Sequence, residues 1–238
     1  MTVQTIITAA GDSRETFIAG GFGSPKSLVA VEGKTVIQHA IESYTTDFSA
    51  LRVAVNEDEA REWAVDEHIR DYFPDAEVML VSTGAKGALV SALLASADLD
   101  LGEPLVVAAG DSRVNVTIHP YVERFLSSGF PASTLAFSSS GKRWSYLALD
   151  TNAKVVEVSE KYEVSNLATT GFFFFQTAQI FCDAAKWVLI NNAEINGRYY
   201  VSTTLNFLIS LGAGVGFERI PPDHYKSWSL PVDFVSGE

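Results

Sequence analysis

The chain has 238 residues, of which 47% are hydrophobic, and its 17 Lys and Arg residues against 29 Asp and Glu residues give a formal net charge of −12. This hydrophobic content excludes a disordered chain, and the length predicts one domain with a sizeable core. The negative charge argues against nucleic acid and anionic membranes as partners, because both would be repelled. A single cysteine, Cys182, excludes a disulfide framework, and no apolar run is long enough for a membrane span. We therefore expect a soluble, cytoplasmic protein.

Short hydrophobic runs alternate with helical patterns along the first half of the chain. The hydrophobic runs predict strands over 3–10, 51–55, 77–81 and 105–109. Apolar residues at helical spacing predict helices over 36–44, 58–73 and 87–97. A loop of small residues over 11–25 follows the first strand. This alternation predicts a parallel sheet with helices on both faces.

The second half of the chain has a different pattern. Its strand-like runs cover 133–137, 144–149, 155–160 and 170–176. The residues 150–153 predict a hairpin turn, and helical patterns return over 178–190 and 201–211. Since no Pro- or Ser-rich linker separates the halves, we expect one α/β domain with a mixed sheet.

The best physical indication of a site is the set of residues at the predicted strand ends. Ligands of α/β sheets bind beyond the carboxyl ends of the strands, and Gly11, Gly84 and Asp111 lie at or shortly after such ends. The loop after the first strand also carries Arg14 and Lys26, although the chain is acidic. Small residues let backbone N–H groups approach phosphate oxygens, and an Arg adds a bidentate donor. Composition alone supports a solvated, flexible loop equally well.

A series of short motifs in fixed order covers nearly the whole chain. Its members are 10–14 (AGDSR), 25–28 (PKSL), 31–37 (VEGKTVI), 83–85 (TGA), 110–111 (GD), 160–161 (EK) and 166–173 (NLATTGFF). The series resembles the signature of the sugar-phosphate nucleotidyltransferases and their capsule-synthesis relatives. The resemblance implies a single Rossmann-like, GT-A-like domain whose central sheet is mixed and mostly parallel. It also implies a nucleotide-binding half over 1–130 and an acceptor-binding half over 131–238.

The resemblance implies a role for each matching residue. Arg14 would hold the β- and γ-phosphates of a nucleoside triphosphate, Lys26 would lie between the α-phosphate and the attacking phosphate, and Asp111 would hold Mg²⁺. The remaining nucleotide contacts would come from Ala10, Gly11, Asp12, Ser13, Thr83, Gly84, Ala85 and Gly110. The acceptor would be bound by Glu160, Lys161, Asn166 and Gly171. The implied reaction transfers NMP from an NTP to a phosphorylated sugar, polyol or similar small acceptor and releases pyrophosphate.

The chain departs from the family pattern at two places. In a direct alignment Asp12 stands where the family has the second glycine of its first loop, whereas a one-residue gap would keep Gly11 as that glycine. The C-terminal stretch 228–233 (WSLPVD) lacks the family's Gly-Thr. The family's second metal-binding acid is therefore missing, and Asp223 is the candidate that could replace it. These departures keep two alternatives open, a nucleotide-binding relative with impaired catalysis and a GT-A-type glycosyltransferase. The latter would need an Asp-x-Asp pair, and Asp98 with Asp100 has that spacing. The resemblance leaves a homo-oligomer open.

Overall fold

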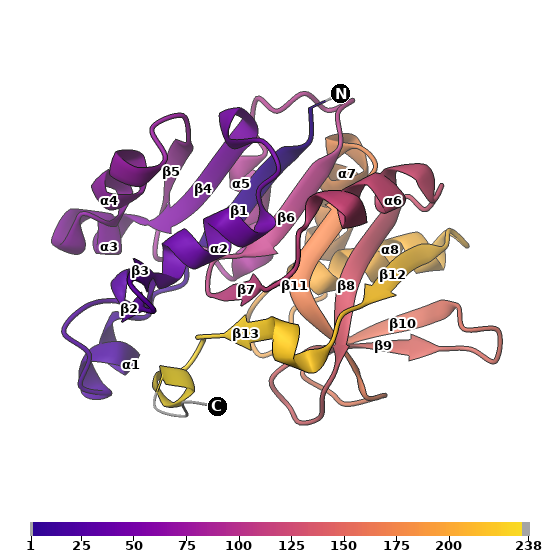
Figure 1. Ribbon diagram of the computed structural model, residues 1–238. Helices are drawn as coiled ribbons and strands as arrows, with labels where there is room; N and C mark the ends of the chain where they lie inside the picture. Colours follow the sequence, from indigo (N-terminus) through magenta and orange to yellow (C-terminus); the bar gives the residue numbers. More distant parts are fainter. Residues whose placement is uncertain (1, 235–238) are drawn as a thin grey trace.

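A nine-stranded mixed sheet runs through the protein in the computed structural model, which describes residues 2–234 (Figure 1). Seven strands follow the order β10-β9-β11-β6-β1-β4-β5, while β8 pairs with β11 and β12. The strands are β1 (Gln4–Ala9), β4 (Leu51–Asn56), β5 (Glu77–Val81), β6 (Leu105–Ala109), β8 (Ala132–Ser138), β9 (Ser145–Leu149), β10 (Val155–Glu160), β11 (Leu167–Phe175) and β12 (Val215–Arg219). Its β6-β1-β4-β5 part is all parallel, with Thr5 opposite Leu51 and Gln4 opposite Leu105.

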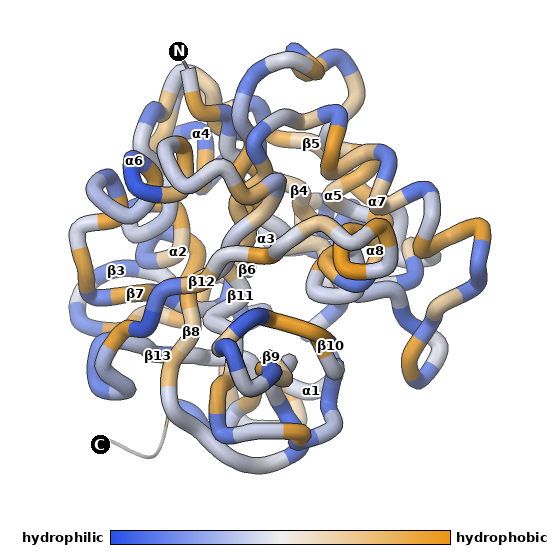
Figure 2. Tube along the Cα trace, turned by 90° about the vertical axis from the view of Figure 1, so that its right-hand side faces the viewer, coloured by the Kyte–Doolittle hydropathy of each residue, from blue (hydrophilic) through white to orange (hydrophobic). Residues whose placement is uncertain are grey.

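Helices cover both faces of the sheet and bury two hydrophobic clusters (Figure 1). One face is covered by α2 (Val36–Tyr44), α3 (Glu57–Trp63), α4 (Val65–Tyr72) and α6 (His119–Ser127). The other face is covered by α5 (Ala88–Ala95), α7 (Ala178–Ile190) and α8 (Thr204–Ser210). The strands run as tan and orange segments through the middle of the molecule, and blue is concentrated in the outer loops (Figure 2). The predicted α/β class with a mixed sheet, mostly parallel in its centre, is confirmed.

Strand β11 joins the parallel part of the sheet to the antiparallel part. It pairs antiparallel with β6 at Phe172–Phe175, and its register with β8 shifts between Thr169 and Phe173. Gly171 lies inside this irregularity with φ +80°, a conformation that favours glycine. All four phenylalanines are buried, with Phe172 and Phe174 in one hydrophobic cluster and Phe173 and Phe175 in the other, so the strand is covered on both faces.

Several sequence predictions about local structure were wrong. The expected loop 11–25 contains a short helix, α1 (Arg14–Ala19). The expected helix 58–73 is two helices, because Ala64 takes a left-handed conformation with φ 52° and ends α3. The start of the expected helix 201–211 is a 3₁₀ turn, Val201–Thr203. Sequence patterns also missed α6 and the edge strand β12.

The C-terminal segment returns to the edge of the sheet near α1 (Figure 1). Strand β13 (Tyr225–Ser227) pairs antiparallel with β7 (Ser112–Val114), and the Trp228 N–H donates to the Asp111 carbonyl oxygen at 2.8 Å. Trp228 is 1% exposed and packs with Phe17 in a small cluster, to which Phe234 adds its ring. Short pieces complete the structure: β2 (Ala30–Val31), β3 (Lys34–Thr35) and the 3₁₀ turns at 26–28, 48–50, 222–224 and 231–234. Within residues 2–234, no helix combines the length and the hydrophobicity needed to cross a membrane.

Candidate active site

Two cavities adjoin beyond the carboxyl ends of β1 and β6, where the sequence placed a site. The first has a volume of about 440 Å³ and the second of about 530 Å³. They share a set of lining residues that we call the junction: Thr8, Lys26, Ala88, Ala109, Asp111, Arg198 and Tyr200. Two separate compartments with a common wall can hold two reactants side by side.

The smaller cavity is built from the loops after β1, β5 and β6. It is lined by seven of the eight residues predicted to bind nucleotide in addition to Arg14: Ala10, Gly11, Asp12, Thr83, Gly84, Ala85 and Gly110. The eighth, Ser13, is 7% exposed and lines neither cavity. At Gly110 a Cβ would come within 2.8 Å of the Ala9 Cβ, so only glycine lets these two loops approach. We call this compartment the nucleotide cavity.

An ion pair stands at the junction. The Lys26 ammonium donates to Asp111 Oδ2 at 2.6 Å, and both side chains keep part of their surface exposed, 20% and 25%. Pro25 starts the 3₁₀ turn that carries Lys26, and Asp111 follows the end of β6. The sequence motifs therefore indicated two residues, 85 positions apart, that the fold brings into contact.

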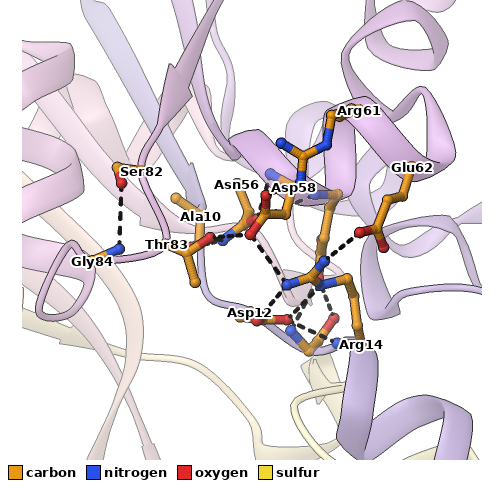
Figure 3. Close-up of polar contacts among 12 residues, drawn as sticks. Ala10, Asp12, Arg14, Asn56, Asp58, Arg61, Glu62, Ser82, Thr83 and Gly84 are labelled. Carbon is orange, nitrogen blue, oxygen red and sulfur yellow. Dashed lines mark hydrogen bonds and ion pairs between the residues drawn. The ribbon is translucent and has the colours of Figure 1, made fainter.

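Arg14 lies elsewhere. Its guanidinium pairs with Asp12 at 2.9 Å, Asp58 at 3.2 Å and Glu62 at 2.9 Å, and it lines neither cavity (Figure 3). The hydrogen bond from Arg14 lowers the pKa of Asp12, and the bond to Asp12, followed by that to Glu62, raises the pKa of Arg14. The acid that interrupts the family's glycine pattern thus binds the arginine of the same loop.

The larger cavity is lined by both faces of the β9–β10 hairpin base and by the C-terminal segment. Its carboxylate Glu160 accepts hydrogen bonds from Ser145 Oγ and, at 2.7 Å, from Ser202 Oγ. Burial raises the pKa of Glu160, against the opposing effect of the two hydroxyl groups and the charge of Lys161. The Lys161 ammonium lies 4.9 Å from the centre of the Tyr200 ring. We call this compartment the acceptor cavity.

The remaining predicted residues fall into two groups, those that line the acceptor cavity and those that line neither cavity. Gly171 lines the acceptor cavity together with Glu160 and Lys161. Asn166 lines neither cavity, and its carbonyl oxygen accepts a bond from the Ser139 N–H. Asp223 lies in the 3₁₀ turn Pro222–His224, also outside both cavities.

The Asp-x-Asp pair that a glycosyltransferase would need is not at the site. Asp98 and Asp100 line a third hollow together with Gln4, and the Gln4 amide donates to the Asp100 carbonyl oxygen at 2.8 Å. Gln4 starts β1, so this pair lies at the opposite end of the sheet from the junction. This position removes the geometric basis for that alternative.

Arg198 is the functional candidate that sequence reasoning missed. It lines both cavities, and its guanidinium has no ion-pair or hydrogen-bond partner among residues 2–234. The loop that carries it turns at Asn196 and Gly197, both with positive φ, and the Tyr199 N–H donates to the Lys86 carbonyl oxygen at 2.8 Å. Asn-Gly is a strong tight-turn signal, and this turn directly before an arginine could have indicated the position.

The carboxylates at the site suit a hard cation only in a limited way. No group of three His, Cys, Asp or Glu side chains able to hold a metal occurs within residues 2–234. Mg²⁺ is commonly held by one or two carboxylates together with substrate phosphates. Asp111 is the one acid of the junction, so a magnesium ion fits there with phosphate oxygens as its other ligands.

Comparison with known proteins agrees with this geometry. Residues 5–164 match the model of the MobA-like NTP transferase domain. No curated protein sequence matches the chain. Among solved structures, a nucleoside-diphosphate-sugar pyrophosphorylase from Vibrio cholerae RC9 superposes with a TM-score of 0.82 at 19% identity, over 98% of both chains.

Two further structures show the same fold. A Bacillus anthracis protein described as a glucose-1-phosphate thymidylyltransferase has a TM-score of 0.77 at 17% identity, over 98% of this chain and 93% of its own. The inositol-1-phosphate CTP transferase of T. maritima has a TM-score of 0.70 at 14% identity, over 98% and 92%. The family model covers well over half of the chain, and the chain therefore belongs to the family of MobA-like NTP transferase domains.

Proposed function

We propose that this nucleotidyltransferase transfers NMP from an NTP to a phosphorylated sugar, polyol or similar small acceptor and releases pyrophosphate. The observation that carries the proposal is the junction, where Lys26, Asp111 and Arg198 stand between a nucleotide cavity and an acceptor cavity. The similar structures from V. cholerae and T. maritima, named for a nucleotide sugar and for inositol 1-phosphate, support this acceptor class.

The cations at the junction account for the chemistry. An oxygen of the acceptor phosphate attacks the α-phosphorus in line, and the bond to the pyrophosphate oxygen breaks. Lys26 exchanges Asp111 for the phosphate oxygens, and Arg198 approaches the same charge from the opposite loop. Such fixed cations stabilise the charge that builds up in the transition state, so no covalent intermediate with the protein is needed.

The polar groups of each cavity hold one reactant. Residues 10–12 and 83–85 line the compartment for the nucleotide. Glu160, which lines the other compartment, would accept a hydrogen bond from an acceptor hydroxyl. Asp111 would hold Mg²⁺, which supplies positive charge to the triphosphate. Asp223 has no part in this arrangement, because it lies outside both cavities. The assignment of 1–130 to the nucleotide and 131–238 to the acceptor, and a cytoplasmic location, belong to the same proposal.

Thermal unfolding tests the nucleotide half of the proposal. With Mg²⁺ present, one of ATP, CTP, GTP and UTP should raise the unfolding midpoint by several degrees, since a ligand at about 100 times its Kd stabilises by roughly 2.7 kcal/mol. Lys26→Ala should abolish this rise. If no nucleotide shifts the well-folded protein, triphosphate binding has been lost and the proposal is wrong.

Pyrophosphate release tests the reaction. With the nucleotide so identified, a panel of sugar 1-phosphates and polyol phosphates should produce pyrophosphate in step with consumption of the acceptor. Lys26→Ala and Asp111→Asn should each lower turnover by about two orders of magnitude or more, with the fold intact. Wild-type turnover in either variant would contradict the assigned roles. Nucleotide binding without turnover across the panel would identify a non-catalytic relative.

A further inference from the structure

Helix α3, which lines neither cavity, holds both the loop after β1, which carries Ser13, and the 3₁₀ turn that carries Lys26. Its residue Glu59 is 0% exposed, and Glu59 Oε1 accepts two hydrogen bonds from Ser13, from the N–H at 3.0 Å and from Oγ at 2.8 Å. The hydroxyl oxygen of Ser13 in turn accepts a bond from the Lys26 N–H at 3.0 Å. A continuous chain of hydrogen bonds therefore runs from α3 through Ser13 to Lys26.

In this series of hydrogen bonds, the Ser13 hydroxyl group is both a donor and an acceptor. Its hydroxyl proton is donated to Glu59, and its oxygen is committed to Lys26. Ser13 therefore acts as a link between two segments rather than as a ligand, which agrees with its position outside the cavities. Because Lys26 begins its turn at this bond, the direction of its side chain toward Asp111 depends on the link.

The burial of Glu59 is costly for the fold. Its second oxygen, Oε2, is buried without a hydrogen-bond partner among the described residues. Burial raises the pKa of Glu59, while the bonds from Ser13 and the charge of Lys26 act in the opposite direction and the charge of Asp12 adds to the rise. An acid with one unsatisfied oxygen is a poor way to stabilise a core. Its position is better explained by what it holds.

We propose that Glu59 is a positioning residue for nucleotidyl transfer, which fixes the Lys26 ammonium at the junction through the hydrogen-bonded hydroxyl group of Ser13. The inference rests on the proposed function. Helix α3 thus contributes to catalysis through Glu59, although none of its residues lines a substrate cavity. A carboxylate accepts the two hydrogen bonds from Ser13 more strongly than a neutral amide does, and its negative charge also attracts Lys26.

The test is a double-mutant cycle with Lys26. Glu59→Gln keeps the shape and one acceptor oxygen, and it should lower kcat by about tenfold to a hundredfold, the equivalent of hydrogen bonds to a charged group. The KM for the acceptor should change less than kcat, because Glu59 itself lines neither cavity and acts only through Lys26. In a Lys26→Ala background the same substitution should lower kcat by less than about threefold, since residues that act as one unit have non-additive effects.

Gln38→Ala is the matched control. Gln38 is buried, accepts bonds from Thr35 in the capping box of α2 and lines neither cavity. It should lower the unfolding midpoint without changing kcat, and its effects should be independent of Lys26. A purely structural Glu59 would behave in the same way.

A second readout does not depend on turnover. Hydrogen–deuterium exchange over residues 11–28 should be slow in the wild type and faster at Ser13 and Lys26 in Glu59→Gln, whereas Gln38→Ala should leave it unchanged. Wild-type kcat in Glu59→Gln, or a full effect retained in the Lys26→Ala background, would overturn the proposal. If the wild type itself released no pyrophosphate with any substrate pair, the proposed function would fall, and with it the catalytic role of Glu59.

Discussion

Two arginines lie in surroundings that the sequence motifs do not indicate. Arg14 occupies the motif position but is held by three carboxylates, whereas Arg198 matches none of the family motifs and lies between the two cavities. A guanidinium without a carboxylate partner can bind phosphate at once, because it has no ion pair to break. We therefore assign the phosphate-binding guanidinium of the site to Arg198.

Substitution of each arginine separates these roles. Arg198→Ala should lower kcat about a hundredfold to a thousandfold, the usual loss for a removed transition-state donor, and leave the unfolding midpoint nearly unchanged. Arg14→Ala should lower the midpoint, because Asp12, Asp58 and Glu62 then repel one another, and reduce kcat less than about tenfold. Steady-state kinetics and thermal unfolding measure both. The reverse order of the two kcat losses would return the phosphate role to Arg14.

The half-buried acid Glu160 makes stability depend on pH. Because burial raises its folded-state pKa above the ordinary value of 4.5, the folded protein binds the proton more tightly than the unfolded chain does. This contribution to stability is complete below about pH 4.5 and is lost as the pH rises through the folded-state pKa. Glu160→Gln should remove this dependence, so the variant should gain stability relative to the wild type as the pH rises from about 4.5 through the folded-state pKa of Glu160.

Urea unfolding at several pH values measures this difference. Glu67→Gln is the control, because Glu67 is exposed and carries the same change of charge. A difference between Glu160→Gln and the wild type that did not change with pH, or changed as it does for Glu67→Gln, would contradict the effect of burial.

Among the elements, α3 connects two of the three loops that line the nucleotide cavity. Asn56 caps this helix by accepting the N–H groups of Asp58 and Glu59 at 2.9 and 3.1 Å. Its amide also donates to the Ala10 carbonyl oxygen at 3.4 Å and to Thr83 Oγ1 at 3.3 Å (Figure 3). The loops after β1 and β5 therefore share one buried anchor.

Asn56→Ala should weaken both the helix and the cavity. The lost cap should lower the unfolding free energy by about 0.5–2 kcal/mol, and the KM for the nucleotide should rise because the two loops lose their common partner. Thr177→Ala removes the side-chain cap of α7, away from both cavities, and should lower stability alone. An equal nucleotide KM in the two variants would show that α3 does not organise the cavity.

Hydrophobic periodicity predicted the central strands. It did not predict the features that depend on contacts between distant parts of the chain. Strands β1, β4, β5 and β6 are short runs rich in hydrophobic residues that alternate with helices, so their pattern alone was sufficient. The break at Ala64 has neither Gly nor Pro to announce it, and β13 is a three-residue strand whose partner lies over 100 positions earlier.

The site was predicted to a similar extent. Lys26 belongs to the short motif over 25–28 and Asp111 follows the end of β6, and the fold pairs them. The carboxylates that hold Arg14 come mainly from α3, and Arg198 comes from a loop after α7, so only the tertiary structure shows either arrangement.

At the scale of the whole molecule, the C-terminal segment connects the acceptor cavity with the α1 region. Asp233 binds the Arg143 guanidinium with both oxygens, at 2.8 and 2.7 Å, and Arg143 lies over Trp144 at the acceptor cavity. The same segment touches the α1 region, where Phe234 packs on Phe17. The arrangement of the acceptor wall thus depends on residues near the end of the described chain.

Weakening the ion pair between Asp233 and Arg143 should affect the binding of one substrate only. Asp233→Asn should raise the KM for the acceptor several-fold, up to about tenfold, while the KM for the nucleotide stays the same, because Arg143 lines the acceptor cavity alone. Glu218→Gln is the matched control, since Glu218 also binds an arginine, Arg124, with both oxygens, at 2.6 and 2.7 Å, outside both cavities. Equal acceptor KM values in the wild type and in Asp233→Asn would show that the segment has no role in the wall.

The central claim is that an oxygen of the acceptor phosphate attacks the α-phosphorus at the junction of the two cavities. The most direct test uses an acceptor whose phosphate oxygens carry a heavy isotope, with mass spectrometry of every product. Attack by the acceptor phosphate should place the label in the nucleotidylated acceptor and leave pyrophosphate and free NMP unlabelled, and Lys26→Ala should suppress the labelled product. Unlabelled NMP as the main product would mean that water attacks instead, and the protein would then be a hydrolase and not a transferase.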